Sequence, residues 1–394
     1  MSALETLRVL DMTQYEAGTS CTQALAWLGA DVVKVEPPRG DPGRGVSQDP
    51  TVVSQYFLNY NSNKKSLAIN LKSEQGRELF LGLVPKFDAF IENYAPGVME
   101  SLGLTYDVLS AVNPGLIYGR IKGFGLSGPY SDYSCYDWVA LAAAGAYSVT
   151  GTADGPPMTP GVTCADSGTG LQMALAVTAA YVQKQRTGRG QFIEISMQEA
   201  VTMFMKTQGL AGWGQSAAPR NGNRRGPTIN VYPCAPGGPN DHIMIAAVTS
   251  EQWDGLCAGI ERPELLADER FEAPANRLAN ADILYDEIAA WTRTKTKYEA
   301  MQHLASLGVP CSATLDTYEL FTDPHLTSRH FIQTVTHASG KEVQLMRGPI
   351  LMSDSHVPIK AAPLLGSDTD AVLTADGGFS ADEIAKLRES GIVY

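Results

Sequence analysis

A carboxylate beside two glycines stands at the expected start of a long helix. The segment 161–174 reads GVTCADSGTGLQMA, and Asp166 directly precedes an amphipathic pattern, where an aspartate is most simply an N-cap. Gly168 and Gly170 follow in the first turn, although each costs a helix about 1 kcal/mol relative to alanine. Glycines there leave room and N–H groups for a ligand, and the helix dipole favours an ionised aspartate. Asp166 could therefore act as a nucleophile that forms an acyl intermediate.

A second candidate is the loop 220–227, which reads RNGNRRGP. Its central residues are Gly222, Asn223, Arg224, Arg225 and Gly226. Two adjacent arginines between glycines could form a mobile lid that clamps a carboxylate, because the guanidinium fork binds such groups in a bidentate way. The alternative is a solvated loop between domains.

A third feature is a set of lysines near expected strand ends and loops. They are Lys34, Lys64, Lys65, Lys72 and Lys122. Solvation at the surface explains each of them alone. Only a shared edge of the fold would make them a phosphate-binding set.

The composition disfavours several classes of protein. The 394 residues hold 42 acidic and 30 basic side chains, a net charge of −12, whereas a nucleic-acid footprint needs a basic face. No apolar run reaches the ~18 residues of a membrane span, and the N-terminus shows no signal peptide. We expect a cytoplasmic protein that binds neither nucleic acid nor membrane.

Metal and dinucleotide chemistry are also disfavoured. All six histidines lie beyond residue 241, none with ligand spacing, so no metal site is expected. The six cysteines include no C-x-x-C pair, which is typical of reduced cytosolic thiols. The first strand–helix turn, 13–19, has one glycine where a dinucleotide fingerprint has G-x-G-x-x-G, and no P-loop appears.

Strand-like and helical segments alternate in the first half of the chain. Strands are expected at 7–12, 31–36, 89–92, 116–121 and 192–196, and helices at 19–28, 74–83 and 166–185. Further strands are expected at 242–247 and 342–346, and further helices at 250–260, 283–292, 297–307 and 381–389. The alternation predicts an α/β fold with an open parallel sheet.

A change in composition marks a domain boundary. Residues 209–240 are rich in Gly, Pro, Asn and Arg, as is typical of a linker or functional loop. We expect the N-terminal part of a large domain over 1–205 and a linker with an active-site loop over 206–226. A small α/β domain is expected over 227–330, and a return to the large domain over 331–394.

Nine segments, in order along the chain, resemble the class III CoA-transferase family, which includes formyl-CoA:oxalate and carnitine-type CoA-transferases. They are 7–11, 26–36 (AWLGADVVKVE), 40–44 (GDPGR), 63–67, 92–97 (ENYAPG), 136–137, 165–168 (ADSG), 187–191 with 193–196, and 362–366 (APLLG). The resemblance implies a Rossmann-like open parallel sheet in a large domain built from both termini. It also implies a smaller α/β domain and a homodimer of two interlocked rings.

Asp166 stands where this family carries its catalytic aspartate. The resemblance implies that its carboxylate attacks the thioester of an acyl-CoA and gives an aspartyl mixed anhydride. The released CoA thiolate then forms an aspartyl-CoA thioester, which the acceptor carboxylate attacks in turn. A second anhydride and the CoA thiolate complete the new acyl-CoA. This chemistry uses CoA as a substrate and implies no tightly bound cofactor.

The resemblance also implies contacts with CoA at several positions. These are Glu16, Ala17, Arg39, Ile69, Asn70, Leu71, Lys72, Asn93, Tyr94, Ala95, Lys122, Tyr136 and Asp137; an alignment shifted by one residue puts Pro38 in the place of Arg39. The loop Gly222, Asn223, Arg224, Arg225, Gly226 falls where formyl-CoA transferases have a run of glycines over the active site.

Some positions depart from the family pattern. Glu16 stands where the oxalate enzymes have a glutamine, Ser101 where an arginine binds CoA phosphate, and Ser134 where there is a lysine. The charge of Glu16 argues against oxalate as the acceptor. The arginines of the lid favour a longer dicarboxylic acid.

Two other functions fit parts of the pattern. The superfamily contains α-methylacyl-CoA racemases, which move a proton with a histidine and an aspartate. Here Tyr136 occupies the place of that histidine, and no histidine precedes His242. A protein that binds CoA without catalysis is the alternative from another class, and it predicts that replacing Asp166 changes no reaction.

Overall fold

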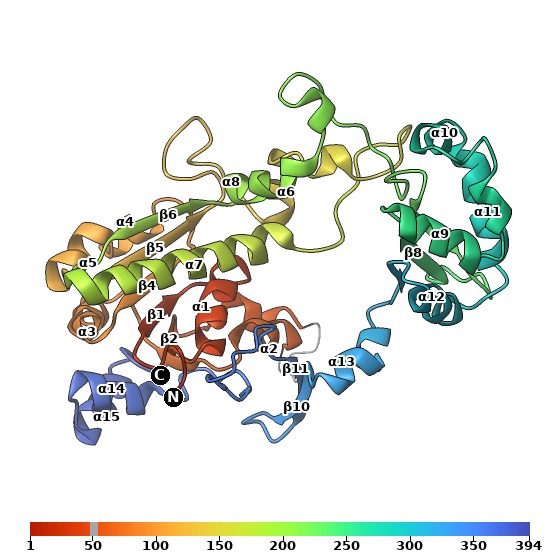
Figure 1. The fold of residues 1–394 in the computed structure, drawn as a ribbon. Helices are drawn as coiled ribbons and strands as arrows, with labels where there is room; N and C mark the ends of the chain where they lie inside the picture. The colour runs from red at the N-terminus through yellow and green to blue at the C-terminus, as the bar shows by residue number, and fades with distance from the viewer. Residues whose placement is uncertain (48–53) are drawn as a thin grey trace. The chain divides into compact units, whose positions relative to one another are not determined.

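The computed structural model describes residues 1–47 and 54–394, which form two compact units. The first comprises Met1–Tyr147, Thr159–Trp213 and His330–Tyr394, and the second comprises Ser148–Met158 and Gly214–Arg329 (Figure 1). The first unit thus combines both ends of the chain. Residues 148–158 belong to the second unit, although they fall within the segment 1–205 expected for the large domain.

The first unit is built on one sheet of six strands in the order β3-β2-β1-β4-β5-β6. The strands are β1 (Arg8–Met12), β2 (Asp31–Glu36), β3 (Lys65–Ala68), β4 (Ala89–Glu92), β5 (Ile117–Lys122) and β6 (Phe192–Ser196). Every neighbouring pair is parallel, which confirms the expected α/β class and open parallel sheet. The strand order reverses between β1 and β4, where such sheets bind ligands beyond the carboxyl ends of the strands.

Both faces of the sheet are covered by helices, because successive strand residues point to opposite sides. Val9 and Ile91 belong to one core, whereas Leu10 and Phe90 belong to the other. The first face carries α1 (Ala17–Trp27), α6 (Asp137–Ala143), α7 (Cys164–Thr187) and α8 (Met197–Thr202) (Figure 1). The second carries α3 (Glu74–Leu83), α5 (Tyr106–Val112), α14 (Thr369–Gly377) and α15 (Ala381–Glu389).

Smaller elements complete this unit. Helix α2 (Gln55–Asn61) packs with the antiparallel hairpin β10 (Ile332–Thr336) and β11 (Glu342–Met346) through Phe57 and Leu345. The short helix α4 (Val98–Leu102) follows β4. Across the described ranges of both units, no helix combines the length and the apolar character that crossing a membrane requires.

Helices α1 and α7 cross closely because α7 has a glycine at the contact. A Cβ atom on Gly170 would lie 2.5 Å from the carbonyl oxygen of Ala17 and 2.9 Å from the amide nitrogen of Cys21. A Cβ atom on Gly168 would lie 2.9 Å from the ring of Phe204. Both glycines therefore admit neighbouring protein atoms, which corrects the interpretation that they leave room for a ligand.

Two of the lysines predicted at the surface are buried beneath the turn that follows β1. Lys34 Nζ lies 2.8 Å from Asp41 Oδ2 and donates to the carbonyl oxygen of Thr13 at 2.7 Å. Lys64 Nζ lies 2.9 Å from Asp11 Oδ2, and both side chains are fully buried. Because a buried charge is costly without a partner, these pairs fix the turn. Neither solvation nor phosphate binding explains Lys34 and Lys64, so that expectation is wrong.

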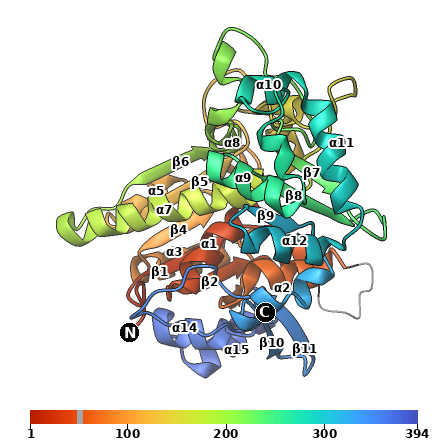
Figure 2. The same cartoon turned by 45° about the vertical axis from the view of Figure 1, so that its right-hand side comes forward.

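The second unit is a small antiparallel sheet covered by helices. Its strands are β7 (Ile229–Pro233), β8 (His242–Ala246) and β9 (Cys311–Ala313), in the order β7-β8-β9. Its helices are α9 (Ser250–Gly259), α10 (Pro274–Ala279), α11 (Ala281–Thr292), α12 (Lys297–Ser306) and α13 (Pro324–Ser328). Figure 2 shows α9, α11 and α12 grouped with these strands, and Ile243, Trp253, Ile288 and Leu304 form the core between them.

Candidate active site

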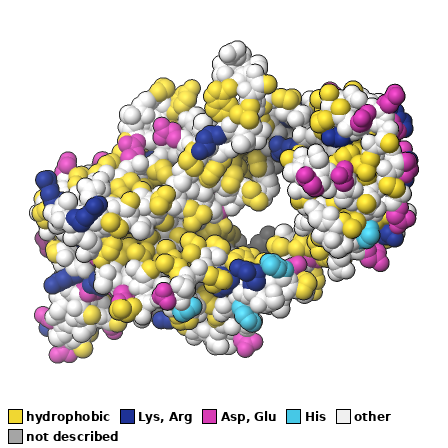
Figure 3. Space-filling view, viewed as in Figure 1, with side chains coloured by type: hydrophobic (Ala, Val, Ile, Leu, Met, Phe, Trp, Pro, Cys, Tyr) yellow, Lys and Arg dark blue, Asp and Glu magenta, His cyan; other side chains and the backbone are white. Residues whose placement is uncertain are grey.

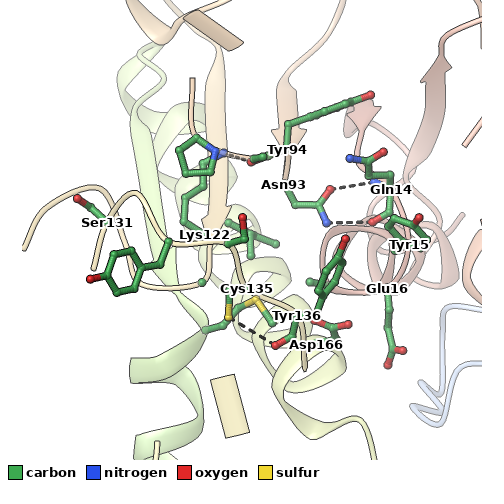
Figure 4. Close-up of a pocket in the computed structure, with 18 residues that line it drawn as sticks. Gln14, Tyr15, Glu16, Asn93, Tyr94, Lys122, Ser131, Cys135, Tyr136 and Asp166 are labelled. Carbon is green, nitrogen blue, oxygen red and sulfur yellow. Dashed lines mark hydrogen bonds between the residues drawn. The ribbon is translucent and has the colours of Figure 1, made fainter. Parts of the chain in front are cut away.

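A cavity of about 160 Å³ opens at the carboxyl edge of the six-stranded sheet, where the strand order reverses (Figure 4). It lies among the segments that follow β1, β4 and β5. Asn93 joins the first two segments: its Oδ1 accepts a hydrogen bond from the N–H of Gln14 at 2.8 Å, and its Nδ2 donates to the carbonyl of Gln14 at 2.9 Å. This side chain therefore fixes both walls of the cavity.

Most of the residues implied by the resemblance line this cavity. They are Glu16, Ala17, Asn93, Tyr94, Ala95, Lys122, Tyr136 and Asp166. In Figure 4, Tyr136 and Asp166 lie close together, and Glu16 stands beside them at the start of α1. The fold thus brings together side chains that are far apart in the sequence.

The sequence suggested that Asp166 is the N-cap of α7. In the structure, Asp166 lies inside the first turn of that helix. The helix begins at Cys164, and the N-cap residue Thr163 makes no side-chain capping bond. Asp137 supplies this function instead: its Oδ1 accepts from the N–H of Ala165 at 2.8 Å and from that of Asp166 at 2.9 Å. Asp137 is buried and therefore fixes the main chain that carries the carboxyl group of Asp166.

Glu16 holds the same turn from another side. Its side chain is only 3% exposed, and its Oε1 accepts from Thr163 Oγ1 at 2.6 Å and from Ser167 Oγ at 2.7 Å. Tyr60 on α2 also lies beside Glu16. Since Thr163 and Ser167 flank Asp166 along α7, this carboxylate holds both sides of the turn.

Asp166 is half-buried and surrounded by negative groups. Burial is the largest reason that its pKa rises to about 8, and the nearby carboxylates of Glu16 and Asp137 raise it further. Asp166 is therefore mostly protonated at pH 7 in the free protein. This differs from the ionised aspartate expected from the helix dipole, because loss of solvation and like charge outweigh that dipole.

Lys122, the cation that lines the cavity, is already engaged. Its Nζ lies 3.2 Å from Glu92 Oε2 and also donates to the carbonyl oxygen of Tyr94. Arg120 Nε contacts the other oxygen of this buried carboxylate at 2.6 Å. Burial lowers the pKa of Lys122, although Glu92 opposes that shift. Lys122 thus holds the segment after β4 in place.

The remaining residues predicted to contact CoA lie outside the cavity. They are Arg39, Ile69, Asn70, Leu71, Lys72 and Asp137, the last of which caps α7 as described above. The side chains of Ile69 and Leu71 are buried in the core, and the N–H of Asn70 donates to the carbonyl of Ile392 at 2.8 Å. The side chains of Arg39 and Lys72 are exposed.

The predicted lid loop, Gly222 to Gly226, belongs to the second unit. Its first residues line an open cleft of about 680 Å³ together with His242 and Tyr285. The Arg224 guanidinium pairs with Asp282 and lies 4.7 Å from the centre of the Tyr285 ring. Arg225 is exposed. The loop therefore presents two cations in a surface that is open to solvent.

Sequence reasoning missed three residues of the site. Thr163 and Ser167 hold Glu16, and Tyr15 has a left-handed backbone with φ of 57° and an edge-to-face contact with Tyr136 at 6.3 Å. The two hydroxyls beside Asp166 were a visible signal. The sequence did not show that Glu16 is their partner, because Glu16 lies 151 residues from Ser167.

The chain matches the family described as CoA-transferase family III over residues 4–369. It is 38% identical to the formyl-CoA:oxalate CoA-transferase of Streptomyces coelicolor, with 99% of each chain covered. It is 36% identical to a protein of the same name from Rhodopseudomonas palustris strain BisA53, covering 99% of this chain and 97% of the relative.

Solved structures agree with this match. A CAIB/BAIF family protein from Brucella suis superposes with a TM-score of 0.83 at 30% identity, covering 94% of this chain and 98% of that one. Rv3272 from M. tuberculosis superposes with a TM-score of 0.81 at 28% identity, covering 94% and 99%. With similarity over nearly its whole length, the chain belongs to CoA-transferase family III and is an enzyme of this class.

Proposed function

We propose that this enzyme moves CoA from an acyl-CoA donor to a carboxylic acid, with Asp166 as the covalent nucleophile. The position of Asp166 carries the proposal. Its carboxyl group lines the cavity at the carboxyl edge of the sheet, on a helix turn whose main chain is held by Asp137. A thioester bound in this cavity would meet a carboxylate that is already fixed in place.

The proposed reaction has four steps. The ionised Asp166 attacks the thioester carbonyl, so that an aspartyl anhydride forms and CoA thiolate leaves. The thiolate attacks the aspartyl carbonyl, which gives an aspartyl-CoA thioester and releases the donor acid. The acceptor carboxylate attacks this thioester, so that a second anhydride forms and CoA leaves again. The thiolate finally attacks the acceptor's acyl carbonyl, which yields the new acyl-CoA and restores Asp166.

The residues around the cavity are proposed to hold the thioester end of CoA. Tyr94, Ala95 and Tyr136 line it, and Asn93 keeps its walls together. Arg39 and Lys72, which are exposed beyond the cavity, are proposed to meet the charged nucleotide end. The racemase alternative has no support here: among the described residues that line the cavity there is no histidine.

Trapping of the intermediate tests this function. After incubation with a panel of acyl-CoAs, including formyl-CoA and succinyl-CoA, hydroxylamine should convert Asp166 to a hydroxamate that peptide mass spectrometry locates. The same treatment of Asp166→Asn should leave that peptide unmodified. Modification that maps to another residue, or no adduct with any donor, would contradict the assignment.

The acceptor is proposed to be a dicarboxylic acid held by the lid loop. The curated relatives are named for oxalate, and the exposed Arg224 and Arg225 supply cations suited to a second carboxylate. Arg224→Ala and Arg225→Ala should each raise the acceptor KM by about tenfold, because a charge-assisted hydrogen bond is worth about 1.5–3 kcal/mol.

Steady-state kinetics with acceptor and donor varied separately checks this prediction. The donor KM should change little. Arg270→Ala is the matched control, since Arg270 is an exposed arginine of the same unit that pairs locally with Asp268. An unchanged acceptor KM in both lid variants would remove the lid from acceptor binding.

A homodimer is also part of the proposal. An apolar cavity of about 550 Å³ lies between α1, α7 and residues 347–359, and Leu171 and Leu175 on α7 are 56% and 71% exposed. Figure 3 shows hydrophobic side chains gathered over this part of the first unit. A second copy of the chain would cover this surface. A monomeric mass in solution by light scattering would contradict the arrangement.

A further inference from the structure

Glu16 does not present its carboxylate as a simple contact for CoA. Its Oε1 is occupied by the hydroxyls of Thr163 and Ser167, at 2.6 and 2.7 Å. The side chain is buried, although Glu16 also belongs to the wall of the cavity. A glutamate that accepts two short hydrogen bonds from one helix turn acts on that turn, and Asp166 is one of the three residues between the two donors.

We propose that Glu16 is the positioning residue of Asp166, acting through Thr163 and Ser167, and that its negative charge controls the reactivity of Asp166. The inference rests on the proposed role of Asp166 as the nucleophile.

The first part of the proposal follows from geometry. Asp137 holds the main chain of the turn through the N–H groups of Ala165 and Asp166. Glu16 holds the side chains before and after Asp166. With both carboxylates in place, the turn is fixed on two sides, and the Asp166 carboxyl group is aimed at the cavity. Neither carboxylate needs to touch the substrate for this effect.

The second part follows from the charges that face Asp166. Glu16 faces it from the start of α1, Asp137 from α6, Cys135 from the segment before α6 and Tyr56 from α2. Tyr60, also on α2, lies beside Glu16. Lys122, across the cavity, is engaged by Glu92. The two carboxylates and burial all disfavour the ionised form of Asp166. Removing the charge of Glu16 should therefore make Asp166 ionise at lower pH.

Glu16→Gln separates the two effects. The amide oxygen of a glutamine can still accept from Thr163 and Ser167, but the negative charge is gone. Ser167→Ala is the reciprocal variant, because it removes one hydrogen bond and keeps the charge. Both changes are made in the full chain.

The ionisation of Asp166 can be followed without substrate. An aspartate that stays protonated in the folded state makes the protein lose stability as pH rises above the unfolded pKa, and this loss stops at the folded-state pKa. The quantity to measure from pH 5 to 10 is the Tm of the chain with Asp166 minus the Tm of the Asp166→Asn variant. This difference should fall as the pH rises and then level off. When the same comparison is made in the Glu16→Gln background, the Tm difference should level off at a pH about one unit lower.

Kinetics supply the second readout. The acid limb of the kcat/KM profile should move to lower pH by a similar amount in Glu16→Gln and should stay in place in Ser167→Ala. In Ser167→Ala, kcat should instead fall by about tenfold, because the turn is less well fixed. If Glu16→Gln does not fold, Ser167→Ala combined with Thr163→Val tests the positioning effect alone.

The outcomes are distinct. If the pH at which the Tm difference levels off is the same in Glu16→Gln as in the wild type, the charge effect is overturned. If kcat is unchanged in the hydroxyl variants, the positioning effect is overturned. An enzyme without any CoA transfer would refute the proposed function. The substrate-free titration would still decide whether Glu16 governs the ionisation of Asp166.

Discussion

Asp166→Asn is expected to abolish CoA transfer, with kcat lowered about 10³-fold or more. An amide in this position cannot form the anhydride, and no other described carboxylate of the first turn of α7 lines the cavity. Because the Asp166 carboxyl group has a pKa of about 8, most of it is protonated at neutral pH. The activity of the wild type should therefore rise with pH as Asp166 ionises. Rates of acyl-CoA formation from pH 6 to 9 measure both effects.

The same variant should gain stability. Asp166 has a higher pKa in the folded protein than in the unfolded chain, so the wild type loses stability as pH rises from about 4 to about 8. Asp166→Asn removes that loss, and at pH 8 it should be more stable by about 1–2 kcal/mol, since each pKa unit is worth about 1.4 kcal/mol and partial exposure weakens the effect. Loss of activity by misfolding would lower Tm instead.

Asp107→Asn is the control for both measurements. Asp107 also lies in the first turn of a helix, α5, but it is exposed and is not among the residues that line the cavity. It should leave kcat unchanged and the pH dependence of Tm as in the wild type. An Asp166→Asn enzyme that keeps more than about one-hundredth of its kcat would show that Asp166 is not the nucleophile.

Local sequence patterns predicted the sheet well. The expected strands 31–36, 89–92 and 192–196 coincide with β2, β4 and β6, because all three are rich in β-branched and apolar residues, and β2 and β4 are almost wholly buried. The helix 74–83 coincides with α3, whose N-cap Ser73 accepts from the N–H of Gly76. β3 was missed: Lys65–Ala68 is a short strand that carries a lysine, so periodicity alone did not reveal it.

The charge state of the site could not be predicted in the same way. The helix dipole is a local property, and it indicated an ionised Asp166. The effects that disfavour ionisation arise only in the tertiary structure. Glu16 reaches α7 because α1 packs against α7, and this close packing depends on Gly170. Lys34 and Lys64 were misjudged for a similar reason. Their partners Asp41 and Asp11 become visible only when the strands are assembled.

Asp137→Ala is expected to have the second largest effect, on both activity and stability. The carboxylate of Asp137 satisfies two N–H groups at the start of α7, and a lost cap of this kind costs about 0.5–2 kcal/mol. The freed turn carries Asp166, and a displacement of about 1 Å at a reacting group can cost about 10²-fold in rate. Thermal unfolding and kcat should therefore fall together.

Asp137→Asn distinguishes capping from charge. Its amide oxygen can still accept from the N–H groups of Ala165 and Asp166, so Tm should stay close to that of the wild type. The lost charge should let Asp166 ionise at lower pH, because Asp137 is one of the groups that raise the pKa of Asp166. If the alanine and asparagine variants instead lose kcat equally, capping is not what Asp137 contributes to the rate. If neither loses kcat, the turn is held by Glu16 alone, and the hydroxyls of Thr163 and Ser167 carry the positioning of the nucleophile.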